Sequence, residues 1–257
     1  MSPLRVITLN LNGIRAAHRK GGFTWLLAQN ADVICVQEIK AQEAILADPQ
    51  FALAGYQSYF HCAEKKGYSG VGIYTRHHPK TVVTGIGLDW ADREGRYVAV
   101  DLGGLWVASL YLPSGTSGEA RQALKYDLLA YYRDYLTTHN MTSPSIICGD
   151  FNIAHKAIDL KNWRANQTHS GFLPEERAWM DHLFNHMGFV DAFRVVNQEK
   201  DQYTWWSHRG RAWEKNVGWR IDYQVLSPTC AATVKAVSIY KDQRFSDHAP
   251  LIVDYEV

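Results

Sequence analysis

The sequence predicts an α/β protein in which two stacked β-sheets are flanked by helices. Two observations predict this class. Short apolar runs rich in β-branched residues recur along the whole chain, and fewer amphipathic segments with helical spacing lie between them. The chain has 257 residues, and a chain of this size buries roughly 70–75% of its unfolded surface. A large core is therefore available.

Nine apolar runs are expected to form strands, because each is short and rich in β-branched or aromatic residues. In chain order they are Arg5–Leu11, Val33–Val36, Gly70–Thr75, Arg96–Leu102, Trp106–Leu112, Ser145–Cys148, Arg220–Leu226, Val234–Ile239 and Leu251–Tyr255.

A first helix is expected over Glu119–Thr138, after a capping box formed by Thr116 and Glu119. The apolar residues of this segment recur at helical spacing. Those expected on one face are Leu124, Leu128, Tyr131, Tyr135 and Leu136.

A second helix is expected from Pro174 to Met187, with Trp179, Leu183 and Met187 pointing inward. Pro174 suits the first helical turn, and Gly188 suits the position just past the last turn.

Nothing in the sequence marks a domain boundary, so residues 1–257 are expected to form one catalytic domain. The four cysteines have no CxxC spacing, which fits a reducing compartment. The N-terminal residues enter a strand-like run without a signal-peptide pattern, and no apolar stretch is long enough to span a bilayer. We therefore expect a cytoplasmic monomer with no membrane partner, associated with the nucleoid if the source is bacterial.

The charge balance gives no sign of a nucleic-acid partner, because 27 basic residues face 26 acidic ones. Metal-binding carboxylates or clustering of the basic residues on one face could hide such a partner. On charge alone the basic clusters are better explained as solvated surface. They are Arg15/Arg19/Lys20, Lys65/Lys66, Lys156/Lys161/Arg164 and Arg209/Arg211/Lys215.

Polar residues able to bind a metal or move a proton stand at the ends of at least six of the predicted strands. Neighbouring strands can bring such ends to one rim of a sheet. For any one run, solvent exposure is the favoured explanation of a polar end. The combination of carboxylates, amides, one His and one Tyr nevertheless indicates a site. The residues are Asn10, Asn12, Gln37, Glu38, Tyr111, Asp150, Asn152, Asp222, Asp247 and His248.

Oxygen donors with a single His suit Mg²⁺ or Mn²⁺ better than Zn²⁺. Glu38 is the first choice of ligand. His182 and His186 are four apart, but HLFNH lacks the Glu that follows the first His in zinc proteases, so a plain helix face is favoured. Adjacent Ser246, Asp247 and His248 do not make a serine triad, whose members are seldom neighbours in sequence.

The chain resembles the exonuclease III-type AP endonucleases of the endonuclease/exonuclease/phosphatase superfamily over essentially its whole length. The motifs that carry the resemblance are LNLNGIR, VQEIK, EKKGYSGVGIYTR, EGRYV, YLPSG, CGDFNIAHKAIDL, GFLPEER, NVGWRIDY and SDHAPL. GDFN and SDH mark the superfamily, whereas GYSGVG, GFLPEER and NVGWRIDY are more specific. The resemblance implies a four-layer α/β sandwich with two mixed sheets packed face to face.

The resemblance also implies roles for the polar residues. Metal binding is implied for Glu38, with Asn10, Asn12, Asp247, Asp150 and Asn152 near the ion. Asp150 activates the attacking water, which Asn152 holds, and His248 contacts the phosphate while Asp222 keeps it protonated. The family leaves Asp or His open as the base; we favour Asp150, because a carboxylate-paired His⁺ is the better oxyanion donor. Tyr111 matches a tyrosine that donates to the phosphate or to the leaving oxygen.

The implied substrate is double-stranded DNA with an abasic site, cut on the 5′ side of the lesion to leave a 3′-hydroxyl and a 5′-deoxyribose phosphate. Trimming of 3′ ends and 3′→5′ exonuclease action are secondary expectations. Trp205, Trp219 and Ile221 match the pocket for the flipped-out abasic sugar, although a core role is the simpler reading of a Trp. Expected DNA contacts are Tyr68, Asn166, Arg15, Lys20, Lys65, Arg96 and Arg209.

Asn12 departs from the family pattern, since some members carry Asp there, leaving one carboxylate fewer near the metal. Two rival functions stay open. A phosphatase of the same superfamily would act on inositol phosphates or lipids and ignore abasic DNA. A non-catalytic DNA-binding module would require a decayed set of polar residues, but Glu38, Asp150, Asp222 and His248 are all present.

Overall fold

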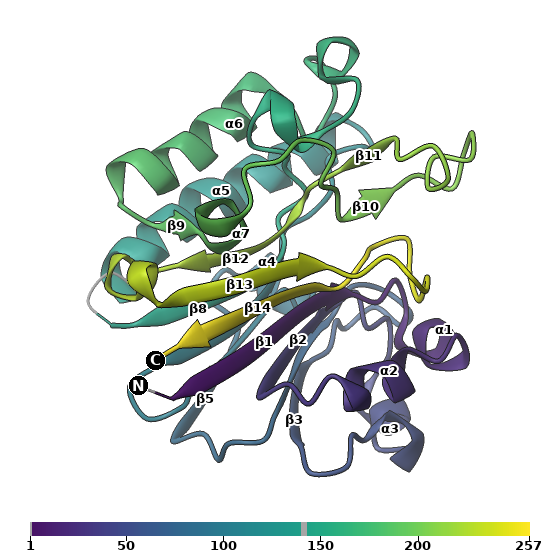
Figure 1. Ribbon diagram of the computed structural model, residues 1–257, viewed down its shortest axis with the longest axis vertical. Helices are drawn as coiled ribbons and strands as arrows, with labels where there is room; N and C mark the ends of the chain where they lie inside the picture. The colour runs from purple at the N-terminus through teal and green to yellow at the C-terminus, as the bar shows by residue number, and fades with distance from the viewer. Residues whose placement is uncertain (1, 140–142) are drawn as a thin grey trace.

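The computed structural model describes residues 2–139 and 143–257, and its core is a pair of six-stranded sheets (Figure 1). The first sheet has the order β13-β14-β1-β2-β4-β3. Only β1 and β2 run parallel in it; their neighbours are antiparallel. Its strands are β1 (Pro3–Asn10), β2 (Val33–Gln37), β3 (Gln57–His61), β4 (Val71–Thr75), β13 (Val234–Ile239) and β14 (Leu251–Glu256).

The second sheet has the order β5-β6-β7-β8-β12-β9 and is also mixed, because β7 and β8 are parallel. Its remaining pairs are antiparallel. Its strands are β5 (Thr81–Thr84), β6 (Tyr97–Asp101), β7 (Trp106–Tyr111), β8 (Ser145–Asp150), β9 (Val190–Asp191) and β12 (Asp222–Leu226).

Alternation along each strand divides the apolar residues between the two faces of a sheet. In β1, Val6 belongs to the core between the sheets, whereas Ile7 and Leu9 belong to a second core on the outer face. The inner core joins Val6 and Cys35 of the first sheet to Ile146 of the second. The sheets therefore pack face to face.

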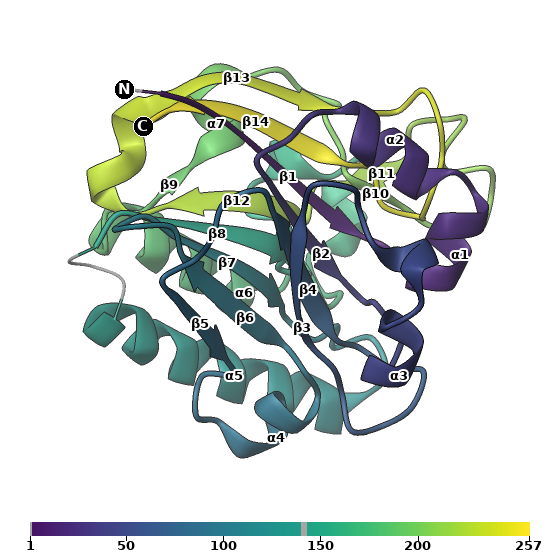
Figure 2. The same cartoon turned by 90° about the horizontal axis from the view of Figure 1, so that it is seen from below.

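Helices cover the outer faces, so the molecule has four layers (Figures 1 and 2). Helices α1 (Ile14–Arg19), α2 (Gly22–Ala28) and α3 (Glu43–Leu46) pack on the outer side of the first sheet. Helices α5 (Glu119–His139) and α6 (Pro174–Asp181) pack on the outer face of the second sheet. Two short helices, α4 (Asp89–Arg93) and α7 (Ala192–Val196), complete the set. The four-layer sandwich expected from the sequence is confirmed.

The long helix α5 forms where expected, but its buried face is shifted. Its buried residues are Lys125, Leu128, Leu129, Tyr132 and Leu136. Tyr131, expected inside, is exposed, and Leu124 and Tyr135 are half-buried. The expected Thr116 cap is also wrong, because the Thr116 hydroxyl bonds to Ser114 while the Gly118 carbonyl accepts the first helical N–H groups.

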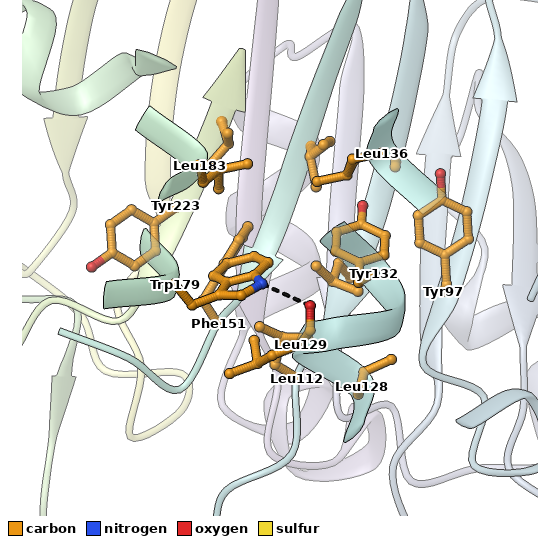
Figure 3. Packing of buried hydrophobic residues seen from close by; sticks show 14 of the residues in the cluster. Tyr97, Leu112, Leu128, Leu129, Tyr132, Leu136, Phe151, Trp179, Leu183 and Tyr223 are labelled. Carbon is orange, nitrogen blue, oxygen red and sulfur yellow. Dashed lines mark hydrogen bonds between the residues drawn. The ribbon is translucent and has the colours of Figure 1, made fainter. Parts of the chain in front are cut away.

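The second predicted helix is confirmed, and its last turn is a π-helix over His182–His186. Trp179, Leu183 and Met187 are buried, and Gly188 has a left-handed φ of 73°. The Trp179 indole donates to the Leu129 carbonyl at 2.7 Å, which joins α6 to α5 (Figure 3). Both helices thus pack on the second sheet as one layer.

All nine predicted strands are present with small differences at their ends. The edge strands β3 and β5, the two-residue strand β9 and a small two-stranded sheet were not predicted from the sequence. That sheet pairs β10 (Trp205–Trp206) with β11 (Gly218–Trp219). Within the described residues, no helix combines the length and apolarity needed to cross a membrane.

Candidate active site

Strand register gathers the polar strand ends at one rim of the sandwich. Asp150, the last residue of β8, pairs with Tyr111 on the parallel strand β7. On its other side it pairs with Asp222, the first residue of the antiparallel strand β12. In the facing sheet, Asn10 at the end of β1 pairs with Gln37, next to Glu38. The clustering expected from the sequence is therefore present.

Glu38 and Asp150 come from different sheets and are bridged by one amide. Asn10 Nδ2 donates to Glu38 Oε1 at 2.8 Å and to Asp150 Oδ2 at 2.9 Å. One ligand atom from each of Glu38, Asp150 and His248 lies within 4.8 Å of the others. The two carboxylates at this spacing could hold a cation that prefers oxygen ligands.

His248 is buried and held by Asp222. Its Nδ1 lies 2.8 Å from Asp222 Oδ2, and its Nε2 lies 3.8 Å from Asp150 Oδ2. Burial lowers the pKa of His248, but the charge and hydrogen bond of Asp222 outweigh burial and raise that pKa to about 10. His248 is therefore a cation at neutral pH and can donate from Nε2 to an anion.

Asp150 is fully enclosed by the rim. Burial, with repulsion from Asp222 and Glu38, raises the pKa of Asp150 to about 8, although His248 acts in the opposite direction. The Asn152 backbone N–H donates to Asp150 Oδ1 at 2.8 Å. A carboxylate in this state can accept a proton near neutral pH, and a bound cation would favour its ionised form.

Asn152 is turned toward Asp150 by its backbone. Its φ of 51° lies in the left-handed region, and its Nδ2 donates to the Leu112 carbonyl at 2.8 Å. Asn12, Glu38 and Lys40 also have left-handed φ values, of 44°, 49° and 50°. Such conformations are unfavourable for residues other than glycine and cluster at functional sites. The left-handed backbone lets these residues, which lie in the turns after their strands, direct their side chains toward the same rim.

Asn12 and Asp247 lie beside the carboxylates and bond to each other, with Asn12 Nδ2 2.9 Å from Asp247 Oδ1. The sequence analysis missed Lys40, whose Nζ lies 2.8 Å from Glu38 Oε2 and also donates to Asn12 Oδ1. The signal was its place in VQEIK, two residues after Glu38. Burial raises the pKa of Glu38, but Lys40 outweighs burial and the net shift is downward.

Arg96 contacts both the ring and the backbone of Tyr111. The Arg96 guanidinium lies 4.7 Å from the centre of the Tyr111 ring and donates to the Tyr111 carbonyl at 2.8 Å. Arg96 was expected to contact DNA, but it is only 2% exposed and also bonds Glu94 and Tyr68, so it has no free face for a phosphate. Burial and the Glu38 carboxylate raise the pKa of Tyr111, so it remains a hydroxyl donor.

Tyr68 is half-buried at the edge of this network, where its hydroxyl also accepts from Arg121, a residue that the sequence analysis missed. Glu94 joins the two arginines, since its Oε2 lies 2.7 Å from Arg96 Nε and 2.6 Å from Arg121 Nη2. Glu94 and Arg96 stand in EGRYV and Tyr68 in EKKGYSGVGIYTR, but Arg121 lies outside every quoted motif, so the cluster is recognised only in the folded chain.

Trp205 and Trp219 form an aromatic wall next to the rim. Their rings meet edge to face with centroids 6.5 Å apart, and both pack on a buried cluster that includes Ile221. Trp205 Nε1 donates to Asp247 Oδ2 at 3.1 Å, and Trp205 bridges His248 in the backbone. The three residues expected to form the apolar pocket are thus together and adjacent to the carboxylates.

The remaining residues expected to bind DNA lie on the surface, where Arg15 and Arg209 are exposed. Asn166 is half-buried and donates to the Asn162 carbonyl at 2.9 Å. Their positions leave them accessible to a large ligand, although nothing in their local contacts identifies one.

Known proteins are similar to this chain in both sequence and fold. The chain is 37% identical over 251 residues to an exodeoxyribonuclease of Bacillus subtilis, covering 96% of this chain and 98% of that protein. It is 34% identical to the DNA repair nuclease APEX1 of Danio rerio, covering 96% and 81%. An AP endonuclease structure from Archaeoglobus fulgidus matches with a TM-score of 0.89 and 27% identity, covering 99% and 100%.

The model of the endonuclease/exonuclease/phosphatase family matches residues 7–248, a range that contains Asn10, Glu38, Asp150, Asp222 and His248. The relatives named above exceed 30% identity over nearly the whole chain. The polar rim at the ends of two mixed sheets agrees with the family assignment. The chain belongs to the endonuclease/exonuclease/phosphatase family.

Proposed function

We propose that this chain is a DNA-repair AP endonuclease. It hydrolyses the phosphodiester on the 5′ side of an abasic site and leaves a 3′-hydroxyl and a 5′-deoxyribose phosphate. One observation carries the proposal: the Glu38, Asp150 and His248 cluster lies directly beside the apolar wall of Trp205 and Trp219. The relatives named above, a DNA repair nuclease and an AP endonuclease among them, support the same activity.

Mg²⁺ is the proposed cofactor, with Mn²⁺ as a substitute. Glu38 is the main ligand, and Asn10, Asn12, Asp150, Asn152 and Asp247 lie around the same position. The donor set fits, because Mg²⁺ takes one or two carboxylates and otherwise prefers oxygen ligands. When bound, the ion supplies positive charge that stabilises the charge developing on the phosphate.

The chain's own residues carry out the proton transfers in this proposal. Asp150 removes a proton from the attacking water, and Asn152 holds that water in line. A pKa of about 8 is close to what a general base at neutral pH requires. His248, protonated and oriented by Asp222, donates a hydrogen bond from Nε2 to a phosphate oxygen. As the water oxygen bonds to phosphorus, the P–O3′ bond breaks, and the Tyr111 hydroxyl donates a proton to the leaving oxygen, which becomes the 3′-hydroxyl.

Selectivity is assigned to Trp205, Trp219 and Ile221. An abasic sugar has no base to unpair or unstack, so moving it out of the helix costs the least free energy. A small apolar pocket then excludes an intact nucleotide. Tyr68, Asn166, Arg15 and Arg209 are proposed to contact the sugar-phosphate backbone, which positions the duplex without reading its sequence.

Three further assignments belong to the same proposal. Residues 1–257 work as one catalytic domain, and the protein acts as a cytoplasmic monomer. The same phosphodiester chemistry also trims blocked 3′ ends and removes nucleotides in the 3′→5′ direction. The name of the Bacillus subtilis relative, an exodeoxyribonuclease, supports exonuclease action.

The test uses a duplex oligonucleotide that carries one tetrahydrofuran abasic analogue. We expect Mg²⁺-dependent nicking that EDTA abolishes, with Asp150→Asn and His248→Asn each reducing the rate by about 100-fold or more. An undamaged duplex and an inositol phosphate serve as competing substrates. Nicking that survives EDTA, or faster turnover of the inositol phosphate than of the abasic duplex, would show that the proposal is wrong.

A further inference from the structure

A buried ion pair lies behind the turn that carries Asp150 and Asn152. Lys125 belongs to α5 and Glu176 to α6, and both side chains are 0% exposed. Their Nζ and Oε1 atoms are 2.5 Å apart. Removing two charges from water costs so much free energy that such a pair adds little net stability. The Lys125–Glu176 pair is therefore better explained by a role in positioning nearby backbone than by a contribution to stability.

Lys125 also binds the catalytic turn itself. Its Nζ donates to the backbone carbonyl of Asn152 at 2.8 Å, a charge-assisted hydrogen bond. Asn152 is the residue with a left-handed φ of 51°, whose side chain lies beside Asp150. The ammonium group of α5 thus holds the backbone carbonyl of a residue with strained backbone geometry.

Glu176 holds the neighbouring segment in the same way. Its Oε2 accepts from the backbone N–H groups of Gly171 at 2.6 Å and Leu173 at 3.0 Å. The Gly171 carbonyl in turn accepts from the N–H of Ala154, two residues after Asn152. One carboxylate therefore connects the start of α6 to the end of the catalytic turn.

Gly171 touches both halves of the site. A Cβ at Gly171 would lie 3.2 Å from the Asn152 carbonyl oxygen and 3.2 Å from Cζ3 of Trp219. The segment is packed between the turn that carries Asn152 and the aromatic wall, with little space for either to shift. Any movement of Glu176 would be transmitted to both.

We propose that Lys125 and Glu176 are positioning residues that fix the Asn152 turn relative to the wall formed by Trp219. Neither touches the reacting atoms. The pair acts through Asn152 and Gly171, so that the group aligning the attacking water and the pocket for the abasic sugar keep one relative arrangement. This inference rests on the proposed function. A small misplacement of reacting groups lowers the chemical rate more than it lowers binding.

The main test replaces both charges in the variant Lys125→Met/Glu176→Leu, since removing one partner alone would leave a buried charge. We expect cooperative unfolding and a Kd for the abasic duplex within about twofold of wild type, with single-turnover nicking reduced about tenfold or more. Amide hydrogen exchange should become faster at residues 150–154 and 170–173. Glu176→Gln keeps the side-chain shape and an amide oxygen near Lys125 but removes the counter-charge, and it should move rate and exchange in the same direction.

The control is Arg5→Met, which breaks the Arg5–Asp254 pair at the other end of β1 and should leave rate and local exchange unchanged. The inference is overturned if a folded charge-free variant nicks and exchanges like wild type, or if its affinity falls as much as its rate. Should the double variant not fold, unchanged rate and exchange in Glu176→Gln overturn it. Should wild type not nick abasic DNA, the proposed function fails, and the exchange data still decide the positioning role.

Discussion

At the scale of single residues, upward pKa shifts of different origin give His248 and Asp150 the acid and base roles. The Asp222 carboxylate keeps His248 protonated, while burial keeps Asp150 able to accept a proton. Both effects arise from enclosure of the rim, because charge interactions strengthen and solvation weakens when water is excluded. The site therefore needs its surroundings as much as its named residues.

Asp222→Asn is predicted to shift the alkaline limb of the pH–rate profile to lower pH. Burial lowers the pKa of His248, and Asp222 is the strongest influence that raises it to about 10. His248 donates only when protonated, so its contribution is present below its pKa and lost as the pH rises through it. Without the carboxylate, the loss should begin below pH 8 and exceed about tenfold at pH 8.5.

The measurement is single-turnover nicking of an abasic duplex from pH 5.5 to 10 with saturating Mg²⁺. His208→Asn is the matched control, because His208 is exposed and lies 3.8 Å from Asp247 rather than from Asp222. An alkaline limb that stays in place in Asp222→Asn would mean that His248 does not act as the protonated donor.

The rim residues could be predicted from the sequence because they stand at the ends of apolar strands and carry carboxylate, amide or imidazole groups, which bind metals or transfer protons. Arg96 could not be placed in the same way, since an arginine in a motif gives no sign of burial under Tyr111. Lys40 and Lys125 were missed because a lysine is usually solvated, and only tertiary contacts reveal a buried partner.

At the scale of elements, strands that are buried on both faces were predictable, whereas of the edge strands only β13, with its run of β-branched residues, was predicted. β2 and β8 are buried at every position and appear as continuous apolar runs. β3 and β5 are mostly half-buried or exposed, so QSYFH and TVVT lack a clear apolar signal. In α5 the period was correct but the face was shifted, since Lys125 lies on the buried side and Tyr131 on the exposed side.

Gly149→Ala is predicted to destabilise the protein and to disturb the site from within β8. A Cβ at Gly149 would lie 1.9 Å from the Leu110 carbonyl oxygen of the parallel strand β7, and backbone cannot yield as a side chain can. We expect a loss of about 3 kcal/mol in the free energy of unfolding. The rate of nicking should also fall, because the next residue is Asp150.

Chemical denaturation measures the stability change. Gly55→Ala separates steric overlap from backbone strain, because Gly55 has a φ of 83° and open space around it. It should cost about 1 kcal/mol and leave activity intact. Equal stability losses in the two variants would contradict the close-packing explanation for Gly149.

At the scale of the whole molecule, the site exists because two sheets end at one rim. Asn10 and Glu38 come from the first sheet, and Asp150 and Asp222 from the second. The near-neutral composition gave no hint of a nucleic-acid partner, and several basic side chains are paired with acids, such as Lys156 with Asp181 and Lys161 with Asp201. The polar site was predictable from the pattern of strand ends, and its activity from the resemblance of the motifs to a known family; neither was predictable from net charge.

The central claim is that Glu38, Asp150 and His248 surround one hard cation and one phosphate. The most direct measurement is an anomalous difference map from crystals grown with Mn²⁺ and a nicked abasic duplex. We predict a metal peak about 2 Å from a Glu38 carboxylate oxygen, with the product phosphate in hydrogen-bond contact with His248 Nε2. A metal that binds only elsewhere, with the phosphate away from His248, would contradict the account.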